Sequence, residues 1–208
     1  MSIPFPSRLL EGYANFRAGR YAAETERYLK LGEGQNPPIM MIACCDSRSA
    51  PETIFDAGPG EIFVVRNVAN LVPPYEPDGR HHSTSAALEF AVLQLGVQHI
   101  VIMGHGRCGG IKAIVEAGDP LSTGDFIGKW LAGLRDVAAV VEEGESAAAR
   151  VTAVERASVE HSLDNLRTFP WIRVREIKGQ LTLHGAWFDI SQGELNVYFE
   201  AERRWAVV

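Results

Sequence analysis

Apolar residues along the chain follow two spacings, which predict strands and helices in alternation. Three short continuous apolar runs are typical of strands buried on both faces of a parallel sheet. Elsewhere, apolar residues recur every three or four positions, as on one face of an amphipathic helix. The predicted strands are 39–44, 61–65 and 99–103, and the predicted helices are 83–95, 111–117, 125–141 and 151–166. This alternation indicates an α/β fold with a largely parallel central sheet flanked by helices.

Both ends of the chain depart from this alternation. The segment 9–31 carries aromatic and aliphatic residues at helical spacing before a glycine-rich breaker, so we expect an N-terminal helical arm over residues 1–34. Near the C-terminus, 180–184 and 194–199 alternate with period two, which predicts two strands at or near the sheet edge, with an antiparallel strand at the edge itself. At 208 residues, the chain is expected to form a single domain, 1–208, that includes the arm.

Composition and charge exclude several classes of protein. Twenty Lys and Arg against 26 Asp and Glu give a net charge of −6, which disfavours binding to nucleic acid or to an anionic membrane. No apolar run approaches the ~18 residues of a membrane span. Three cysteines are too few for a disulfide framework, which favours a reducing compartment. We therefore expect a cytoplasmic protein with a small-molecule substrate.

The first group of chemically active residues follows the strand predicted at 39–44. It reads Cys44-Cys45-Asp46-Ser47-Arg48. In an extended chain, successive side chains point to opposite sides, so Cys44, Asp46 and Arg48 share one side and Cys45 faces the other. In isolation, the Asp-Ser-Arg part is better explained as a turn with a solvated arginine.

The second group, Gly104-His105-Gly106-Arg107-Cys108-Gly109-Gly110, follows the strand predicted at 99–103. Ligand crevices of open α/β sheets lie at the carboxyl ends of strands, so the two groups are expected to meet. Cys44, His105 and Cys108 would supply two thiolates and an imidazole, a set that suits zinc and leaves a fourth position open. The glycines would let the backbone bend so that His105 and Cys108 converge on one ion.

Other interpretations of these residues stay open at this point. Either cysteine alone is better explained as a buried apolar thiol. A non-catalytic zinc module or a thiol redox sensor would use Cys44 and Cys108 as well. Gly104-x-Gly106-x-x-Gly109 also matches a dinucleotide-binding fingerprint, but the expected acidic residue after a second strand is replaced by Gly118-Asp119-Pro120.

The two groups together closely resemble the signatures of the β-class carbonic anhydrases, Cys-x-Asp-Ser-Arg and His-x-x-Cys-Gly-Gly. The likeness covers nearly the whole chain and is closest to the plant-type branch. It continues through Phe55-Asp56, 59–70 and 72–75, and more weakly through 125–130 and 185–189.

The resemblance implies a zinc enzyme that reversibly hydrates carbon dioxide to bicarbonate and a proton by a zinc-bound hydroxide. Cys44, His105 and Cys108 would hold zinc, Asp46 would orient the hydroxide, and Arg48 would keep Asp46 ionised. It also implies a homodimer whose arms wrap the partner, or a tetramer or larger assembly. The implied substrate-binding residues are Gln35, Phe63, Val68, Leu71, Phe90 and Gly109.

The chain departs from family patterns at two places. Plant-type relatives often carry Tyr and His at the positions of Phe90 and Gln94, so a proton relay through them is not expected, and His81 or His82 is the alternative. In another branch, an inhibitory bicarbonate is held by Trp, Arg and Tyr. The corresponding residues here are Met41, Arg66 and Phe188.

Overall fold

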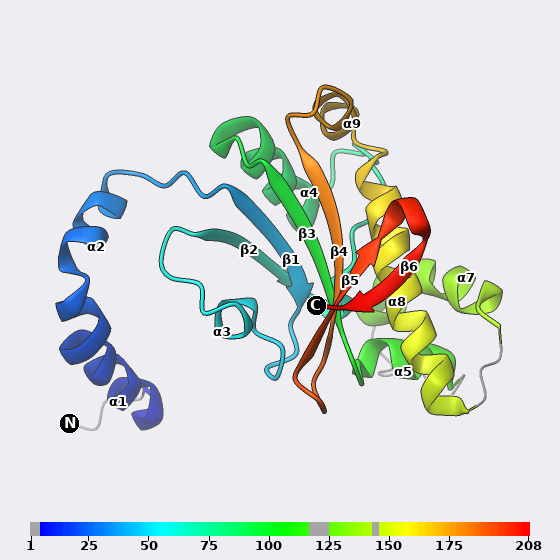
Figure 1. Cartoon of the computed structure of the whole chain (residues 1–208), viewed down its shortest axis with the longest axis horizontal. Coiled ribbons are helices and arrows are strands. Elements are labelled where there is room, and N and C mark those ends of the chain that lie inside the picture. The colour runs from blue at the N-terminus through cyan, green and yellow to red at the C-terminus, as the bar shows by residue number, and fades with distance from the viewer. Residues whose placement is uncertain (1–4, 117–124, 143–145) are drawn as a thin grey trace. The chain divides into compact units, whose positions relative to one another are not determined.

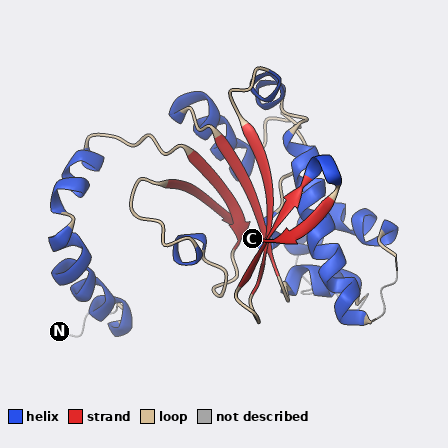
Figure 2. Cartoon of the chain, in the orientation of Figure 1, coloured by secondary structure: helices blue, strands red, loops and turns tan. Residues whose placement is uncertain are grey.

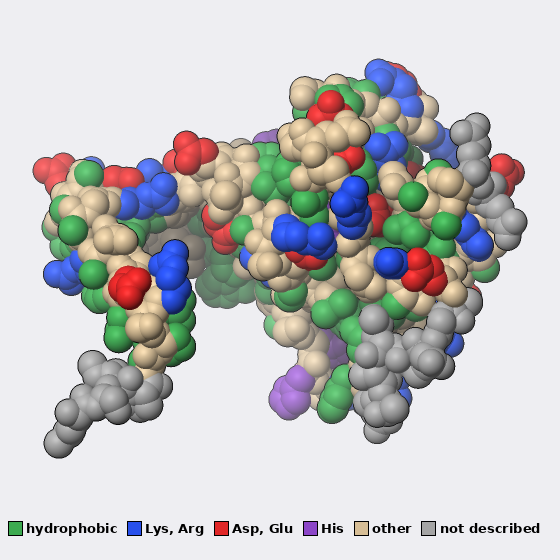
Figure 3. Space-filling model, turned by 90° about the horizontal axis from the view of Figure 1, so that it is seen from below, with side chains coloured by type: hydrophobic (Ala, Val, Ile, Leu, Met, Phe, Trp, Pro, Cys, Tyr) green, Lys and Arg blue, Asp and Glu red, His purple; other side chains and the backbone are tan. Residues whose placement is uncertain are grey.

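The computed structural model describes residues 5–116, 125–142 and 146–208. The chain divides into two compact units, Met1–Asn36 and Pro37–Val208. Within the described residues, no helix combines the length and the apolarity needed to cross a membrane. On the face drawn in Figure 3, acidic and basic side chains are interspersed rather than separated into patches of one sign.

The N-terminal unit is helical, as the spacing of its apolar residues predicts. It consists of α1 (Ser7–Phe16), a π-helical segment (Arg17–Tyr21) and α2 (Thr25–Gly32) (Figure 1). Rings of Phe16, Tyr21 and Tyr28 contact one another, with centroids 5.1 to 6.0 Å apart. No residue of these helices is buried, so an amphipathic element leaves its apolar side chains accessible.

The second unit is built on one six-stranded sheet (Figure 2). The strand order is β2-β1-β3-β4-β5-β6; β2, β1, β3 and β4 run parallel, whereas β5 and β6 are antiparallel to their neighbours. The sheet confirms the predicted α/β class. The strands are β1 (Ile39–Cys44), β2 (Ile62–Asn67), β3 (His99–His105), β4 (Thr182–Asp189), β5 (Glu194–Phe199) and β6 (Arg204–Val207).

The edge of the sheet differs from the prediction. The predicted antiparallel strand is present as β5, but the edge position belongs to β6, which was not predicted. The strand predicted near the edge at 180–184 is β4, which runs parallel to β3 and lies inside the sheet. β6 has only four residues, Arg204–Val207, too few to show a period-two pattern by themselves. It is held by pairing with β5 and by contact between the Tyr198 and Trp205 rings, whose centroids are 5.2 Å apart.

The predicted helices are present in the expected order with corrected boundaries, and residues 51–54 and 170–177 form two further helices that were not predicted. The segment predicted as one helix over 125–141 forms two, separated at Leu131, and the helix predicted at 111–117 begins at Gly109, with residue 117 outside the described part. The helix predicted from 151 begins at Ala147, because the Ser146 hydroxyl accepts the Ala149 amide. The helices of this unit are α3 (Pro51–Ile54), α4 (Ser83–Glu89) with a π-helical continuation (Phe90–Leu95), α5 (Gly109–Val115), α6 (Asp125–Trp130), α7 (Ala132–Val140), α8 (Ala147–Leu166) and α9 (Pro170–Ile177).

The two faces of the sheet are covered differently. On one face, buried side chains of α4 and α8 pack on β1 and β3 to form the main core, for example Leu88 and Val159 against Ile42 and Ile102. The other face carries a small cluster that includes Met41 and Met103, with α3 packed on it. Beside it lies an apolar groove of about 590 Å³. Its lining residues include Ile39, Met41, His99, Val101, His184, Leu195 and Val197.

Candidate metal centre

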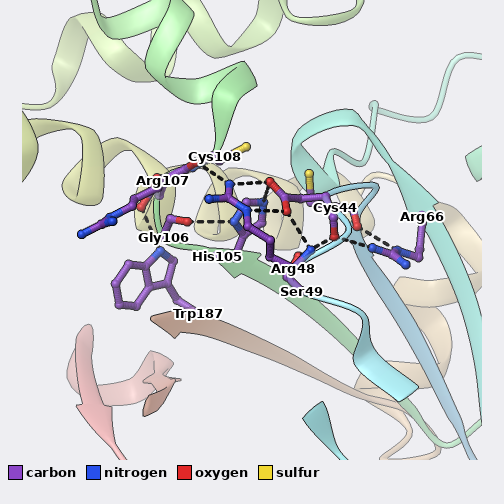
Figure 4. Close-up of polar contacts among 11 residues, drawn as sticks. Cys44, Arg48, Ser49, Arg66, His105, Gly106, Arg107, Cys108 and Trp187 are labelled. Carbon is purple, nitrogen blue, oxygen red and sulfur yellow. Dashed lines mark hydrogen bonds and ion pairs between the residues drawn. The ribbon is translucent and has the colours of Figure 1, made fainter. Parts of the chain in front are cut away.

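Three predicted ligands meet at the carboxyl edge of the sheet. Cys44 ends β1, His105 ends β3, and Cys108 directly precedes α5. The parallel register pairs Ala43 with Met103, which brings these strand ends level. All three side chains are buried, and their donor atoms lie within 4.8 Å of one another (Figure 4). Cys45 is exposed and does not belong to this group.

The imidazole of His105 is oriented by its own neighbour. Its Nδ1 lies 2.9 Å from the carbonyl oxygen of Gly106. A carbonyl only accepts, so Nδ1 is the protonated nitrogen and Nε2 carries the free lone pair. Nε2 is buried and has no hydrogen-bond partner among the described residues. A buried nitrogen without a partner is costly, and a metal ion between the two thiols would satisfy it.

Backbone amides face both sulfur atoms. The backbone amides of Asp46 and Ala69 act on Cys44, and those of Gly110 and Ile111 at the start of α5 act on Cys108, in each case lowering the pKa of the thiol. A hydrogen bond with Cys108 lowers the pKa of Cys44, with burial acting in the opposite direction. The same bond, together with burial, raises the pKa of Cys108. Cys44 is therefore the more acidic of the two thiols, and the thiolate is the form that binds zinc.

Residues with left-handed backbone surround the centre. Ala69 and Asn70, both buried, have φ of 64° and 48°, and Arg107 between His105 and Cys108 has φ of 59°. Such conformations are costly for residues with a side chain and persist where neighbouring structure enforces them. The backbone of Ala69, one of these residues, also lowers the pKa of the Cys44 thiol.

This finding corrects the role predicted for the glycines. The positive φ between the two ligands belongs to Arg107, and none of Gly104, Gly106 and Gly109 has one. A Cβ on Gly104 would lie 2.9 Å from Val159 of α8, and one on Gly106 would lie 3.1 Å from the Trp187 ring. Gly104 and Gly106 are therefore explained by the close packing of Val159 and Trp187 against the backbone. The glycine spacing that resembles a dinucleotide-binding fingerprint needs no bound phosphate to explain it. Residues 118–120 lie outside the described part.

Asp46 and Arg48 form a fork beside the ligands. Arg48 Nε donates to Asp46 Oδ1 at 2.9 Å and Arg48 Nη2 to Oδ2 at 2.7 Å, while Nη2 also reaches the Arg107 carbonyl at 3.2 Å. The fork holds the pKa of Asp46 well below its usual range. Asp46 Oδ2 is 4.0 Å from His105 Nε2. Both residues lie in a turn after β1 rather than in an extended strand.

A further charged residue near the ligands, Glu155 of α8, was not predicted from the sequence. Its Oε1 accepts the backbone amide of Cys108 at 2.9 Å, and its Oε2 accepts the indole N–H of Trp187 at 3.1 Å. Burial raises the pKa of Glu155, while these N–H donors act in the opposite direction. Glu155 is 47 residues from Cys108 along the chain, and no local motif distinguishes it from Glu160, the other glutamate of its helix.

The predicted substrate residues fall into two groups. Leu71 packs in the apolar cluster of Cys44 and Cys108, Val68 accepts the Trp130 indole N–H at 2.8 Å, and Gly109 begins α5. These three adjoin the ligands.

Phe63 and Phe90 are not gathered there. The Phe63 and Phe90 rings contact each other at 5.9 Å. Register places Phe63 opposite Met40 and Asn67 opposite Cys44, so Phe63 is separated from the Cys44 level by about 13 Å of strand. Gln35 is exposed and belongs to the N-terminal unit.

Comparison with known proteins places this site in a family. The family model described as "Carbonic anhydrase" matches residues 39–195, which include all three ligands. The chain belongs to the carbonic anhydrase family. It is 38% identical over 181 residues to beta carbonic anhydrase 5, chloroplastic, of Arabidopsis thaliana, and 33% identical over 197 residues to beta carbonic anhydrase 3 of the same plant. The alignments cover 84% and 92% of this chain, and 58% and 76% of the relatives.

Solved carbonic anhydrase structures have the same fold. The β-carbonic anhydrase CcaA superposes with a TM-score of 0.88 at 29% identity, over 97% of this chain and 91% of that one. A tetrameric β-carbonic anhydrase of Sordaria macrospora gives 0.82 at 31% identity, over 93% and 96%. The predicted β class and α/β fold are thus confirmed. Family members hydrate carbon dioxide with zinc, and the donor set of Cys44, His105 and Cys108 fits that metal.

Proposed function

We propose that this chain catalyses the reversible hydration of carbon dioxide to bicarbonate and a proton, with zinc held by Cys44, His105 and Cys108. The observation that carries the proposal is the unpartnered, buried Nε2 of His105, which lies among two thiols and beside a carboxylate. Zinc, when bound, lowers the pKa of a coordinated water towards ~7 and so provides a hydroxide nucleophile near neutral pH.

Asp46 and Arg48 are proposed to orient the reacting group. Both oxygens of Asp46 are engaged by Arg48, which keeps the carboxylate ionised and fixed in direction. An ionised carboxylate only accepts hydrogen bonds, so it sets which way a neighbouring O–H points. Arg48 is itself anchored by the carbonyl of Arg107. The pair therefore joins the two segments that supply the metal ligands.

Val68, Leu71 and Gly109 are proposed to form the apolar wall on which carbon dioxide rests. The molecule has no net charge and no hydrogen to donate, so an apolar surface beside the metal suits it. Leu71 is 8% exposed and packs with both ligand cysteines. Gly109, which is exposed and directly follows Cys108, is proposed to continue this wall.

We further propose that the active unit is a homodimer in which residues 1–34 form an arm of a single domain, 1–208. Phe63 and Phe90 do not adjoin the ligands of their own chain, which supports a role at the partner's site, and Gln35 is proposed to bind substrate as well. The arm leaves apolar side chains such as Leu9 and Tyr13 exposed, and the sheet carries an apolar groove. A related enzyme is described as tetrameric, so dimers that pair again fit as well.

A reducing compartment, the cytoplasm, is proposed as the site of action. Cys44, Cys45 and Cys108 are all free, and oxidation of a ligand thiolate would abolish zinc binding. The chain would bind neither nucleic acid nor membrane, in keeping with its net charge of −6.

The experiment that tests the proposal compares zinc-loaded protein with protein stripped by a chelator. Stopped-flow measurement of carbon dioxide hydration should show activity in the loaded protein, its loss after stripping and its return when zinc is restored. Equal rates in the two preparations would overturn the proposal. Sedimentation of the loaded protein tests the dimer separately.

A further inference from the structure

We infer that Glu155 is a positioning residue of the metal centre: its buried carboxylate fixes the backbone that presents His105 and Cys108. The inference rests on the proposed zinc site, but it concerns a residue of α8 that contributes no ligand. This role explains why a carboxylate is buried next to residues 105–108, the ligand segment that carries His105 and Cys108.

Both oxygens of Glu155 are committed to N–H donors. Oε1 accepts the backbone amide of Cys108 at 2.9 Å, and Oε2 accepts the Trp187 indole at 3.1 Å. The residue is 1% exposed, and no ion pair to it is found among the described residues. The adjacent Arg156 instead stacks on the Trp187 ring and bonds to Asn196. A buried, unpaired carboxylate is costly, so its persistence requires that these bonds matter.

The segment that Glu155 holds has a demanding conformation. His105 and Cys108 are separated by Gly106 and by Arg107, whose φ of 59° is unusual for a residue with a side chain. On one side, Arg48 donates to the Arg107 carbonyl at 3.2 Å. On the other, Glu155 accepts the next amide along the chain, that of Cys108. The strained residue is thus held between Arg48 and Glu155.

Trp187 completes the support from the neighbouring strand. It lies on β4, paired with Gly104 of β3, and its ring packs where Gly106 has no Cβ. Its indole orients Oε2 of Glu155, so the other oxygen remains aimed at Cys108. Three elements, α8, β4 and the ligand segment, are therefore joined through one carboxylate.

Glu155→Gln is the discriminating variant because it keeps size and shape. An amide has one accepting oxygen and one donating NH₂ group, so at least one of the two N–H donors meets another donor. The ligand segment should then relax. Residues that orient metal ligands typically change metal affinity about 10- to 100-fold when substituted, and we expect zinc release to accelerate by that order.

The chain offers a matched control on the same helix. Glu160 accepts the Trp205 indole N–H at 2.9 Å, as Glu155 accepts that of Trp187, but its partner lies on β6, away from the ligand segment. Glu160→Gln therefore neutralises a comparable tryptophan-bonded glutamate, while the remaining amide oxygen can still accept the Trp205 indole N–H. It should leave the metal centre unchanged.

Two readouts besides activity test the inference. Zinc release to a coloured chelator reports how firmly the ligands hold the metal, and the visible spectrum of cobalt-substituted protein reports their geometry. We expect both to change in Glu155→Gln and neither in Glu160→Gln, with both variants folded by circular dichroism. Unchanged release and spectrum in Glu155→Gln, or equal changes in both variants, would overturn the inference.

If Glu155→Gln does not fold, Trp187→Phe decides, because it removes one donor and keeps an aromatic ring. Zinc release several-fold faster than in the wild type supports the inference, and wild-type release contradicts it. These readouts are independent of carbon dioxide hydration. A wild-type protein that binds zinc but lacks hydration activity would therefore refute the proposed function without refuting the role of Glu155.

Discussion

Arg48 holds Asp46 at both carboxylate oxygens, through bonds of 2.9 and 2.7 Å, and its own backbone amide donates to Oδ1 as well. Asp46 therefore accepts three N–H groups from one residue. The carboxylate is fixed in direction while remaining within 4.0 Å of the unpartnered nitrogen of His105. Two tasks are therefore divided between different side chains. In the proposed mechanism Asp46 orients the reacting O–H group, and Cys44, His105 and Cys108 bind the metal.

Asp46→Asn should retain zinc but hydrate carbon dioxide more slowly. The amide presents an NH₂ group where the carboxylate presented an acceptor, so orientation is lost while the ligands are untouched. Groups of this kind typically contribute about 10²–10⁴ in rate. Stopped-flow kinetics and metal analysis check this, with Asp164→Asn, an exposed carboxylate of α8, as control. Unchanged kinetics in Asp46→Asn would contradict the orienting role and leave Asp46 and Arg48 with a structural role in the turn only.

Two neighbouring cysteines should respond in opposite ways to the same change. Cys44 belongs to the buried donor group, whereas Cys45 is exposed and outside it. Cys45→Ser should keep its zinc and most of its activity, and Cys44→Ser should lose both. The reverse pattern, measured by metal analysis on the two purified variants, would mean that the end of β1 is displaced by one residue.

Bicarbonate should not inhibit cooperatively. The three positions at which one branch of the family holds the anion carry Met41, Arg66 and Phe188, which lack indole and phenol donors. Arg66 is also engaged, donating to the carbonyls of Cys44 at 2.9 Å and Asp46 at 2.6 Å. We expect a hyperbolic response of the hydration rate to added bicarbonate. A sigmoidal loss of activity would show that Asp46 leaves Arg48 when the anion binds.

Stability should fall as the pH is lowered through the histidine range. Burial, and then the neighbouring His99 at 3.1 Å, hold the pKa of His184 below its ordinary 6.5. Between the lowered pKa of folded His184 and the ordinary 6.5 of the unfolded chain, the unfolded chain takes up a proton that the folded chain does not. The stability that neutral His184 contributes is therefore fully present above pH 6.5 and is lost as the pH falls through the lowered pKa.

Thermal unfolding between pH 7.5 and pH 5, spanning the ordinary histidine value of about 6.5, measures this effect. His184→Gln should flatten the dependence of the melting temperature on pH. His81→Asn, which changes an exposed histidine, should leave that dependence as in the wild type. A slope unaffected by His184→Gln would assign the loss of stability to other groups.

Continuous apolar runs predicted the parallel strands β1, β2 and β3, because burial on both faces selects β-branched and aliphatic residues. The fourth parallel strand, β4, was predicted only from its period-two alternation. The ligand set was also predictable, since parallel strand ends meet at one edge. The break at Leu131 between α6 and α7 was not, because the apolar spacing continues across it. Glu155 was not predictable either, since its role depends on a contact with Cys108 made only after folding.

The predicted roles of Phe63 and Phe90 show a second reason why parts of the site could not be predicted from the sequence. Their sequence context matched a substrate wall, but the register of β1 and β2 keeps Phe63 level with Met40 rather than Cys44. Local sequence cannot reveal whether a residue serves its own site or that of another chain, because that depends on assembly. The dimer proposal makes this distinction testable.

The most direct test of the account measures zinc content and carbon dioxide hydration together in the wild type and in Cys108→Ser. Replacing the thiol removes one of three buried donors, while a hydroxyl of similar shape keeps the packing beside α5. We predict stoichiometric zinc and hydration activity in the wild type, and a parallel fall of both in the variant. Full zinc content and full activity in Cys108→Ser would contradict the assignment of this site.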